Sequence, residues 1–114
     1  MSGLTTHALD MARGRPATGL RVALWILDDG GDTLLRETVT NDQGRTDEPL
    51  LGAAAMKAGR FRLVFALGAY QRAMGGPSGP FEEAPVQFRI ARPDEHHHVP
   101  LLIAPFGYST YRGS

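Results

Sequence analysis

Three of the four histidines in this sequence stand together at His96, His97 and His98, directly before an apolar run, and the fourth lies far away at His7. A neutral imidazole accepts a proton near neutral pH, because its unperturbed pKa is about 6.5. Two neutral histidines beside an arginine could therefore activate a water molecule for hydrolysis. That chemistry requires elements that bring distant histidines onto one surface.

Three other interpretations of the histidine run stay open on the residues alone. The run could be a solvated polar strand end with no function. A His-x-His pair on one strand face can bind zinc, although no third ligand at metal spacing is evident. A Ser-His-Asp triad could use Ser109 or Ser114, but the chain lacks the Gly-x-Ser-x-Gly turn that presents such a nucleophile. The chain has no cysteine, which excludes thiolate ligands and cysteine nucleophiles.

The segment that carries the histidine run alternates with a period of two, as a half-buried strand does. Within residues 96–103, one face carries His97 together with Val99, Leu101 and Ile103, so we expect this face to lie in the core. His98 then points to the opposite, outer face.

The same test applies to residues 4–10, where His7 shares a face with Thr5 and Leu9. At the other end of the chain, Ser109 and Tyr111 alternate onto one face. Apolar side chains accompany the polar ones on these outer faces, and an exposed apolar patch of this kind indicates coverage by another subunit. They are Leu9, Pro100 and Leu102.

Further alternating runs, separated by turns rich in Gly, Pro, Asn and Asp, predict strands at residues 20–27, 34–40, 61–67 and 86–90. With residues 4–10, 96–103 and 108–114, this pattern predicts an all-β sandwich or barrel of about seven or eight strands. One helix is predicted over residues 68–74. Residues 53–59 have good helix propensity but are too few to form a stable helix alone.

The composition fits a single domain over residues 1–114 and argues against several classes of function. Twelve basic and twelve acidic residues balance, and Lys57 is the only lysine, so no basic patch suits nucleic acid or a membrane surface. No window approaches the roughly 18 apolar residues that span a membrane. The amino-terminal residues lack the pattern of a secretory signal, so we expect a cytoplasmic location.

Three motifs resemble those of the transthyretin-related proteins and, within them, the 5-hydroxyisourate hydrolases: LTTHALDMARGRPA, GRTD and YSTYRGS. The resemblance runs from Leu4 to Ser114. The carboxy-terminal YRGS and the His-x-His-Val-Pro run are specific to the hydrolases, whereas LDxARGxPA is shared with transthyretin itself. The resemblance implies a transthyretin-like, two-sheet β-sandwich of about eight strands with one short helix. It also implies a homotetramer, built as a dimer of dimers, with active sites between the dimers.

The resemblance further implies which residues form the site and what they do. Catalysis would fall to His7, Arg45, His98 and Ser114, and substrate binding to His7, Arg45 and Tyr111. The reaction would be the opening of a ring amide of 5-hydroxyisourate by water, without a metal or an organic cofactor. The two histidines would activate the water, and Arg45 would bind ring oxygens and stabilise negative charge. Tyr111 would hydrogen-bond the substrate, and Ser114 would orient a histidine or the water.

The chain departs from the family pattern at His97, where a tyrosine is usual, and we expect this residue to be a packing variant on the core side. The glycine-rich segment MGGPSGPFEE should alter a loop. An alternative function is a transthyretin-like carrier of a small ligand without catalysis, but a carrier would favour an apolar lining over His7, Arg45 and His98. A third reading is a structural sandwich domain within a larger assembly.

Overall fold

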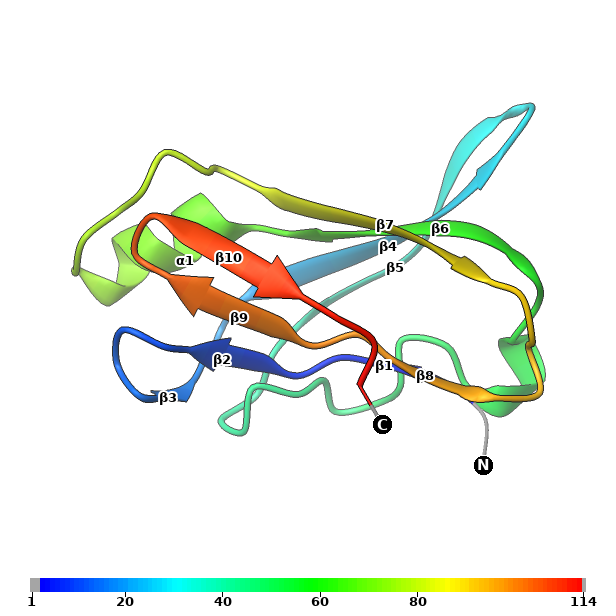
Figure 1. Cartoon of the computed structure of the whole chain (residues 1–114), viewed down its shortest axis with the longest axis horizontal. Helices are drawn as coiled ribbons and strands as arrows, with labels where there is room; N and C mark the ends of the chain where they lie inside the picture. Colours follow the sequence, from blue (N-terminus) through cyan, green and yellow to red (C-terminus); the bar gives the residue numbers. More distant parts are fainter. Residues whose placement is uncertain (1–2, 114) are drawn as a thin grey trace.

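Residues 3–113 of a computed structural model are described here, and Figure 1 shows their strands arranged in layers with one α-helix at one end. The strands are β1 (Gly3–Thr5), β2 (Ala8–Asp10), β3 (Arg15–Pro16), β4 (Arg21–Asp28), β5 (Gly31–Val39), β6 (Gly59–Phe65), β7 (Ala84–Ile90), β8 (His96–His98), β9 (Leu101–Ala104) and β10 (Gly107–Thr110). The helices are the α-helix α1 (Leu67–Met74) and a single 3₁₀ turn, η1 (Ala53–Ala55).

The strands form two four-stranded sheets, in the orders β10-β9-β2-β3 and β5-β4-β6-β7, and a parallel pair β1-β8. Two residues separate β1 from β2, and two separate β8 from β9. Thr5 on β1 pairs with His98 on β8, and Ala8 on β2 pairs with Leu101 on β9. Both pairs have the same offset of 93 residues, so β1 and β2 follow one line beside β8 and β9, and each line is interrupted by two residues. Counting each interrupted pair as one strand turns ten segments into eight. The predicted two-sheet sandwich of about eight strands is confirmed.

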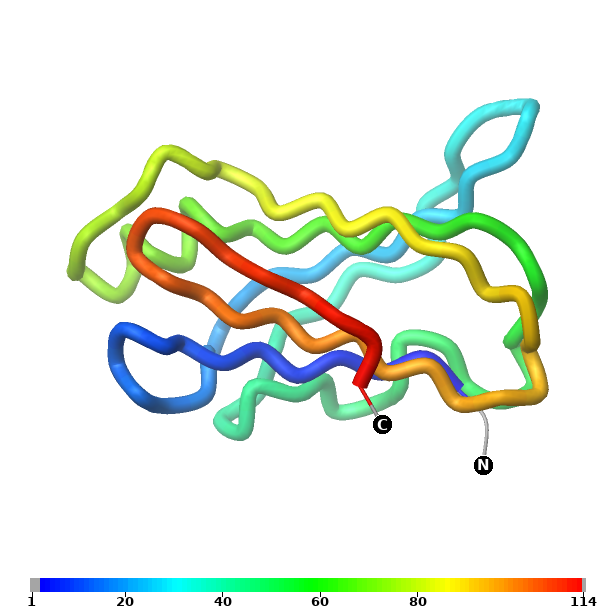
Figure 2. The backbone as a smooth tube through the Cα atoms, in the orientation of Figure 1, coloured from blue at the N-terminus to red at the C-terminus, as the bar shows by residue number. Residues whose placement is uncertain are grey.

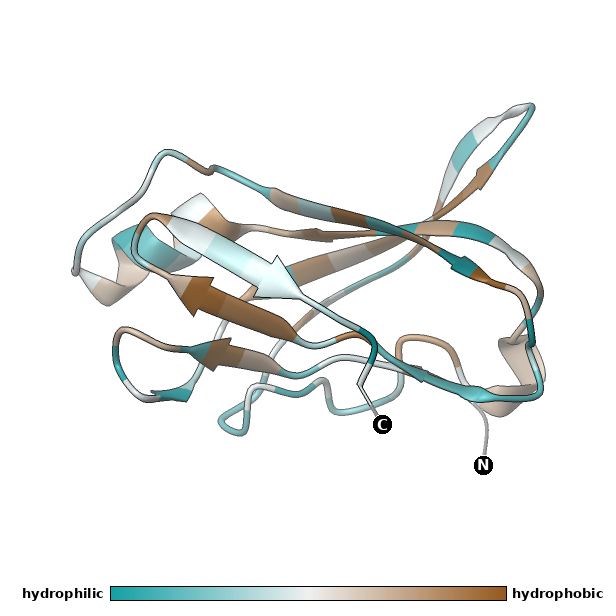
Figure 3. Ribbon diagram, viewed as in Figure 1, coloured by the Kyte–Doolittle hydropathy of each residue, from teal (hydrophilic) through white to brown (hydrophobic). Residues whose placement is uncertain are grey.

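The core lies between the sheets and follows the predicted alternation. On β6 the buried side chains are Phe61, Leu63 and Phe65, and on β9 they are Leu101 and Ile103. Figure 3 shows the consequence, since β4 and β9 are strongly hydrophobic while β10 is close to neutral. Burying such large apolar side chains stabilises each by roughly 1.5–3 kcal/mol relative to exposure, which holds the sheets together.

The helix predicted over residues 68–74 is confirmed as α1, which ends where Gly75 adopts a left-handed conformation with φ of 77°. The hydroxyl of Tyr70 on α1 donates a hydrogen bond of 2.7 Å to the Asp10 carboxylate on β2. The other oxygen of Asp10 accepts the backbone N–H groups of Ala12 and Arg13. Burial, together with the hydrogen bond to Asp10, raises the pKa of Tyr70. This buried contact fixes α1 against the first sheet.

Three sequence predictions are corrected by the structure. The strand predicted over residues 61–67 ends at Phe65, because the next residues turn into α1. The strand predicted over residues 108–114 ends at Thr110, and beyond it Gly113 forms an isolated antiparallel bridge to His98. Pro100, predicted on the outer face, is buried. No helix among residues 3–113 is both long and apolar enough to cross a membrane.

Candidate active site

The parallel pairing of the two interrupted strands brings His7 and His98 onto one surface. Thr5 lies opposite His98, and the same offset of 93 residues places His7 opposite Pro100. His7 is therefore two residues along its strand from the partner of His98. Both histidines are half-buried, whereas His97 is 6% exposed. The predicted division, with His97 in the core and His98 outside, is confirmed. The Nδ1 atom of His97 lies 3.0 Å from the carbonyl oxygen of Glu95.

Arg45 reaches this surface from the loop between β5 and η1. Asn41 organises the loop, because its side-chain oxygen accepts the backbone N–H of Arg45 at 3.2 Å. The carbonyl of Gly44 accepts the N–H of Ala8 at 2.8 Å, which attaches the loop to the start of β2. Gly44 has a φ of 76°, and a Cβ there would clash with the carbonyl oxygen of Ala8 and lie 3.3 Å from the His7 ring. The positive φ and the clash with Ala8 both require glycine. The loop brings exposed Arg45 close enough to affect His98 electrostatically.

Four groups shape the environment of His98. Its Nδ1 atom lies 2.8 Å from the hydroxyl oxygen of Thr5, which also lies 3.1 Å from Nε2 of His96. The rings of His96 and His98 are stacked, with centroids 6.5 Å apart. Burial lowers the pKa of His98 below its usual value, and electrostatic interaction with Arg45, His7 and His96 lowers it further. His98 is therefore neutral at pH 7 and has a lone pair that can accept a proton.

The Thr5 hydroxyl connects the tautomers of the two histidines. A hydroxyl has one proton to donate, so Thr5 can donate to the ring nitrogen of one histidine while it accepts a hydrogen bond from the ring nitrogen of the other histidine. When Nδ1–H of His98 donates to Thr5, the lone pair of His98 is at Nε2. Nε2 is then the atom that can accept a proton, and the hydrogen bond of Thr5 to Nδ1 fixes this tautomer.

Replacing Thr5 with valine keeps the side-chain shape and removes the hydroxyl. We expect kcat/KM of the hydrolysis proposed below to fall by about 5- to 10-fold, the equivalent of one hydrogen bond of about 1–1.5 kcal/mol. Selective ¹⁵N labelling of histidine would show a changed tautomer ratio at His98. Thr33→Val on exposed β5 is the matched control. An unchanged tautomer and rate in Thr5→Val would remove Thr5 from the site.

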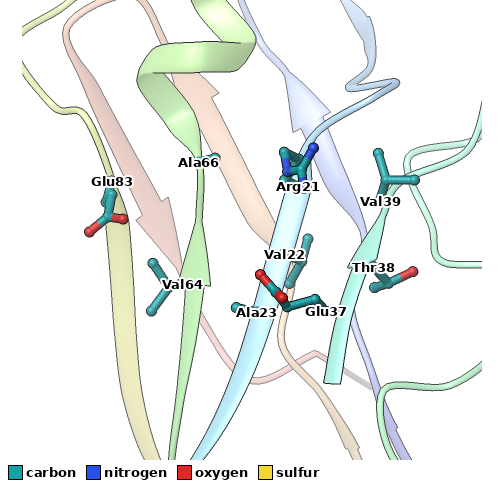
Figure 4. A pocket seen from close by; sticks show the side chains of 9 residues that line it. All are labelled: Arg21, Val22, Ala23, Glu37, Thr38, Val39, Val64, Ala66 and Glu83. Atoms are coloured by element: carbon teal, nitrogen blue, oxygen red, sulfur yellow. The ribbon is translucent and has the colours of Figure 1, made fainter. Parts of the chain in front are cut away.

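Two hollows differ in their chemistry. A cavity of about 180 Å³ borders Arg45 and Thr5. A wider groove of about 390 Å³ lies on the outer face of the other sheet, and Figure 4 shows Arg21, Glu37 and Glu83 around its rim. Neither hollow has a histidine among the described residues that line it. The smaller hollow is the better candidate for hydrolysis, because Thr5, which lines it, contacts the Nδ1 atom of His98.

Tyr111 lies on a different side of β8 from His98 within this chain. It lines a cavity of about 250 Å³ together with His97, Val99 and Phe88, and it is 57% exposed. The structure thus brings together His7, Arg45 and His98 but does not add Tyr111 to that group. The role predicted for Tyr111 stays a prediction. Ser114 lies outside the described residues.

The sequence did not mark every residue that shapes the site. Thr5 carried one signal, since alternation placed it on the face of His7. Gly113 belongs to the YRGS motif, but the motif did not indicate its contact with His98, which depends on strand pairing. Asn41 carried no signal of its contact with Arg45. The assembled surface offers two imidazoles and a guanidinium, which suit the activation of water and the stabilisation of an oxyanion. No group of three His, Asp or Glu side chains that could hold a metal ion occurs within residues 3–113.

Comparisons with known proteins identify the family of this chain. The family model described as HIUase/Transthyretin family matches residues 4–113. A 5-hydroxyisourate hydrolase of Mesorhizobium japonicum is 50% identical, over 97% of this chain and 91% of that protein. The solved structure of Klebsiella pneumoniae 5-hydroxyisourate hydrolase is 42% identical with a TM-score of 0.83, over 99% of this chain and 100% of the other. The crystal structure of (S)-allantoin synthase is 37% identical with a TM-score of 0.90, and the match covers 99% of this chain but 44% of that one. This chain therefore belongs to the HIUase/Transthyretin family.

Proposed function

We propose that this chain hydrolyses 5-hydroxyisourate to 2-oxo-4-hydroxy-4-carboxy-5-ureidoimidazoline, a step in urate degradation. The names of the curated relatives that match nearly the whole chain support this substrate. The observation that carries the proposal is a half-buried His98 with a lowered pKa beside His7 and Arg45. A base that is neutral at pH 7 next to a permanent cation suits the attack of water on a carbonyl group.

In the proposed mechanism, His98 accepts a proton from water as the oxygen attacks the ring carbonyl carbon. The new C–O bond places negative charge on the former carbonyl oxygen, and Arg45 stabilises that charge. The C–N bond then breaks, and an imidazolium, His98 or His7, returns a proton to the departing nitrogen. The roles of Tyr111 in holding the substrate and of Ser114 in orienting a histidine or water remain part of the proposal.

The proposal includes a homotetramer, a dimer of dimers with the sites between the dimers. Half-exposed Leu9 and Leu102 flank the histidines and support this arrangement. Leu34 and Leu35 are exposed on β5, an edge strand whose free backbone groups could pair with a second copy. Sedimentation equilibrium should give the mass of four chains, and the mass of one chain would contradict the assembly. The cytoplasmic location expected from the sequence stays a prediction.

The test of the function is the decay of freshly made 5-hydroxyisourate, generated from urate by urate oxidase and followed by ultraviolet absorbance. We expect the protein to accelerate this decay well beyond the spontaneous rate measured with heat-denatured protein. Decay at the spontaneous rate would contradict the hydrolase and would favour a ligand carrier without catalysis. No covalent intermediate is expected on Ser109 or Ser114, which mass spectrometry of the quenched reaction would check.

A further inference from the structure

Beyond β10 the chain keeps the same antiparallel register, since Gly113 pairs with His98 as Thr110 pairs with Leu101. Figure 2 shows this carboxy-terminal segment beside the junction of β8 and β9. The backbone N–H of Gly113 donates a hydrogen bond of 2.8 Å to the carbonyl oxygen of His98. His98 and Gly113 form an isolated antiparallel bridge. A segment that is far from Arg45 and His7 in the sequence thus contacts the proposed base, His98, directly.

Gly113 lies against the His98 ring itself. A Cβ at this position would lie 2.6 Å from Cδ2 and 3.4 Å from Cγ of His98. Real Cβ atoms are not found as close as the first distance, so the ring would have to move. Gly113 is not among the glycines with positive φ. Glycine is therefore required here for space and not for backbone conformation.

Arg112 fixes the same strand through different atoms. Its Nη2 atom donates a hydrogen bond of 2.9 Å to the carbonyl oxygen of His96. The same atom lies 3.4 Å from the carboxylate of Glu95. Arg92 also contacts that carboxylate, at 3.2 Å through Nε. Arg112 thus holds the backbone of β8 at His96. Arg92 contacts the same Glu95 carboxylate and therefore serves as a comparison for Arg112.

We infer that Arg112 and Gly113 act as a strap that positions the His98 ring, both as positioning residues. Thr5 holds Nδ1 of the ring, Gly113 limits its Cδ2 edge, and His96 stacks on its face. None of these contacts uses Nε2, the atom from which a base would take a proton of water. The strap thus fixes the direction of Nε2. This inference rests on the proposed function for its catalytic consequence.

The decisive variant is Gly113→Ala, with Gly107→Ala as the matched control, since a Cβ at Gly107 meets nothing within 4 Å. We expect Gly113→Ala to lower kcat/KM by about 10²-fold, because displacement of a reacting group by about 1 Å has that effect. The loss should fall on kcat more than on KM. The ¹H–¹³C resonances of the His98 ring should shift, and its titration midpoint should move. Gly107→Ala should match the wild type in every measurement.

A second pair of variants protects the test against misfolding of Gly113→Ala, which circular dichroism would reveal. Arg112→Met should shift the His98 resonances and lower kcat, while Arg92→Met should change neither. Gly113→Ala or Arg112→Met with wild-type His98 resonances and wild-type kcat would overturn the strap. The resonances need no substrate. If they shift while the wild type fails to accelerate hydroxyisourate decay, the strap stands and the proposed function fails.

Discussion

Replacing His98 with asparagine is expected to lower kcat/KM for 5-hydroxyisourate by about 10²–10⁴-fold, the usual contribution of a general base. Asparagine can still contact the Thr5 hydroxyl, but it cannot accept a proton near neutral pH. His96→Asn is the comparison, because His96 contacts the same hydroxyl and stacks on the same ring but is not the proposed base. It is exposed at the end of the strand, and its replacement should lower kcat/KM far less than His98→Asn does. Initial rates in the urate oxidase assay give both values.

The pH dependence of kcat/KM tests the same assignment independently. Burial and electrostatic interaction with the neighbouring groups lower the pKa of His98, so the neutral, active form persists as the pH falls toward about 6.5. The rate should be level at neutral pH and should fall only as the pH drops through this lowered pKa. In His98→Asn the decline on the acid side should vanish from the residual rate. The same decline in the variant would assign the titration to another group.

Replacing Arg45 with lysine is the second substitution with a large expected effect. Lysine keeps the positive charge but lacks the planar pair of donors that binds two oxygens at once. We expect kcat to fall by about 10²–10³-fold, as when one donor to a developing oxyanion is removed. Arg21→Lys on the outer face of the other sheet is the control, and its kcat should be unchanged.

The Arg45→Lys variant also separates the two influences of this side chain. Its charge contributes to the lowered pKa of His98, and lysine retains that charge. The midpoint of the decline at acid pH should therefore stay near its wild-type value while kcat falls. A wild-type kcat/KM would show that the guanidinium does not bind the transition state.

The fold was largely predictable because alternation reports burial directly. The runs of β4, β6, β7 and β9 carry apolar side chains at every second position, so burial on one face selects strands. The interruptions were not predictable by the same means. Alternation continues through Pro100, yet proline cannot donate to a ladder, and β9 begins only after it. Leu67 continues the apolar pattern of β6 but enters α1, because a helix also accepts a leucine there.

The site was predictable only where one strand decides the direction of a side chain. Alternation placed His7 and His98 on outer faces, and the structure agrees. It could not show that those faces are neighbours, because the register between the two strands depends on the whole sandwich. It could not show the contact between Gly113 and the His98 ring either, since that contact depends on the pairing of the carboxy-terminal segment with β8. The separation of Tyr111 from His98 across β8 has the same origin.

The parallel register between the two interrupted strands has a consequence for how activity arises during synthesis and folding. His7 and His98 are 91 residues apart in the chain (98 − 7 = 91), and closing so long a loop carries an entropic cost before any contact rewards it. Such non-local pairing makes folding slow. A nascent chain on the ribosome therefore has half of the acid–base pair until residue 98 has been made and has paired. Hydrolytic activity should thus appear only when the native strands have paired, and not when the chain first collapses into a compact state.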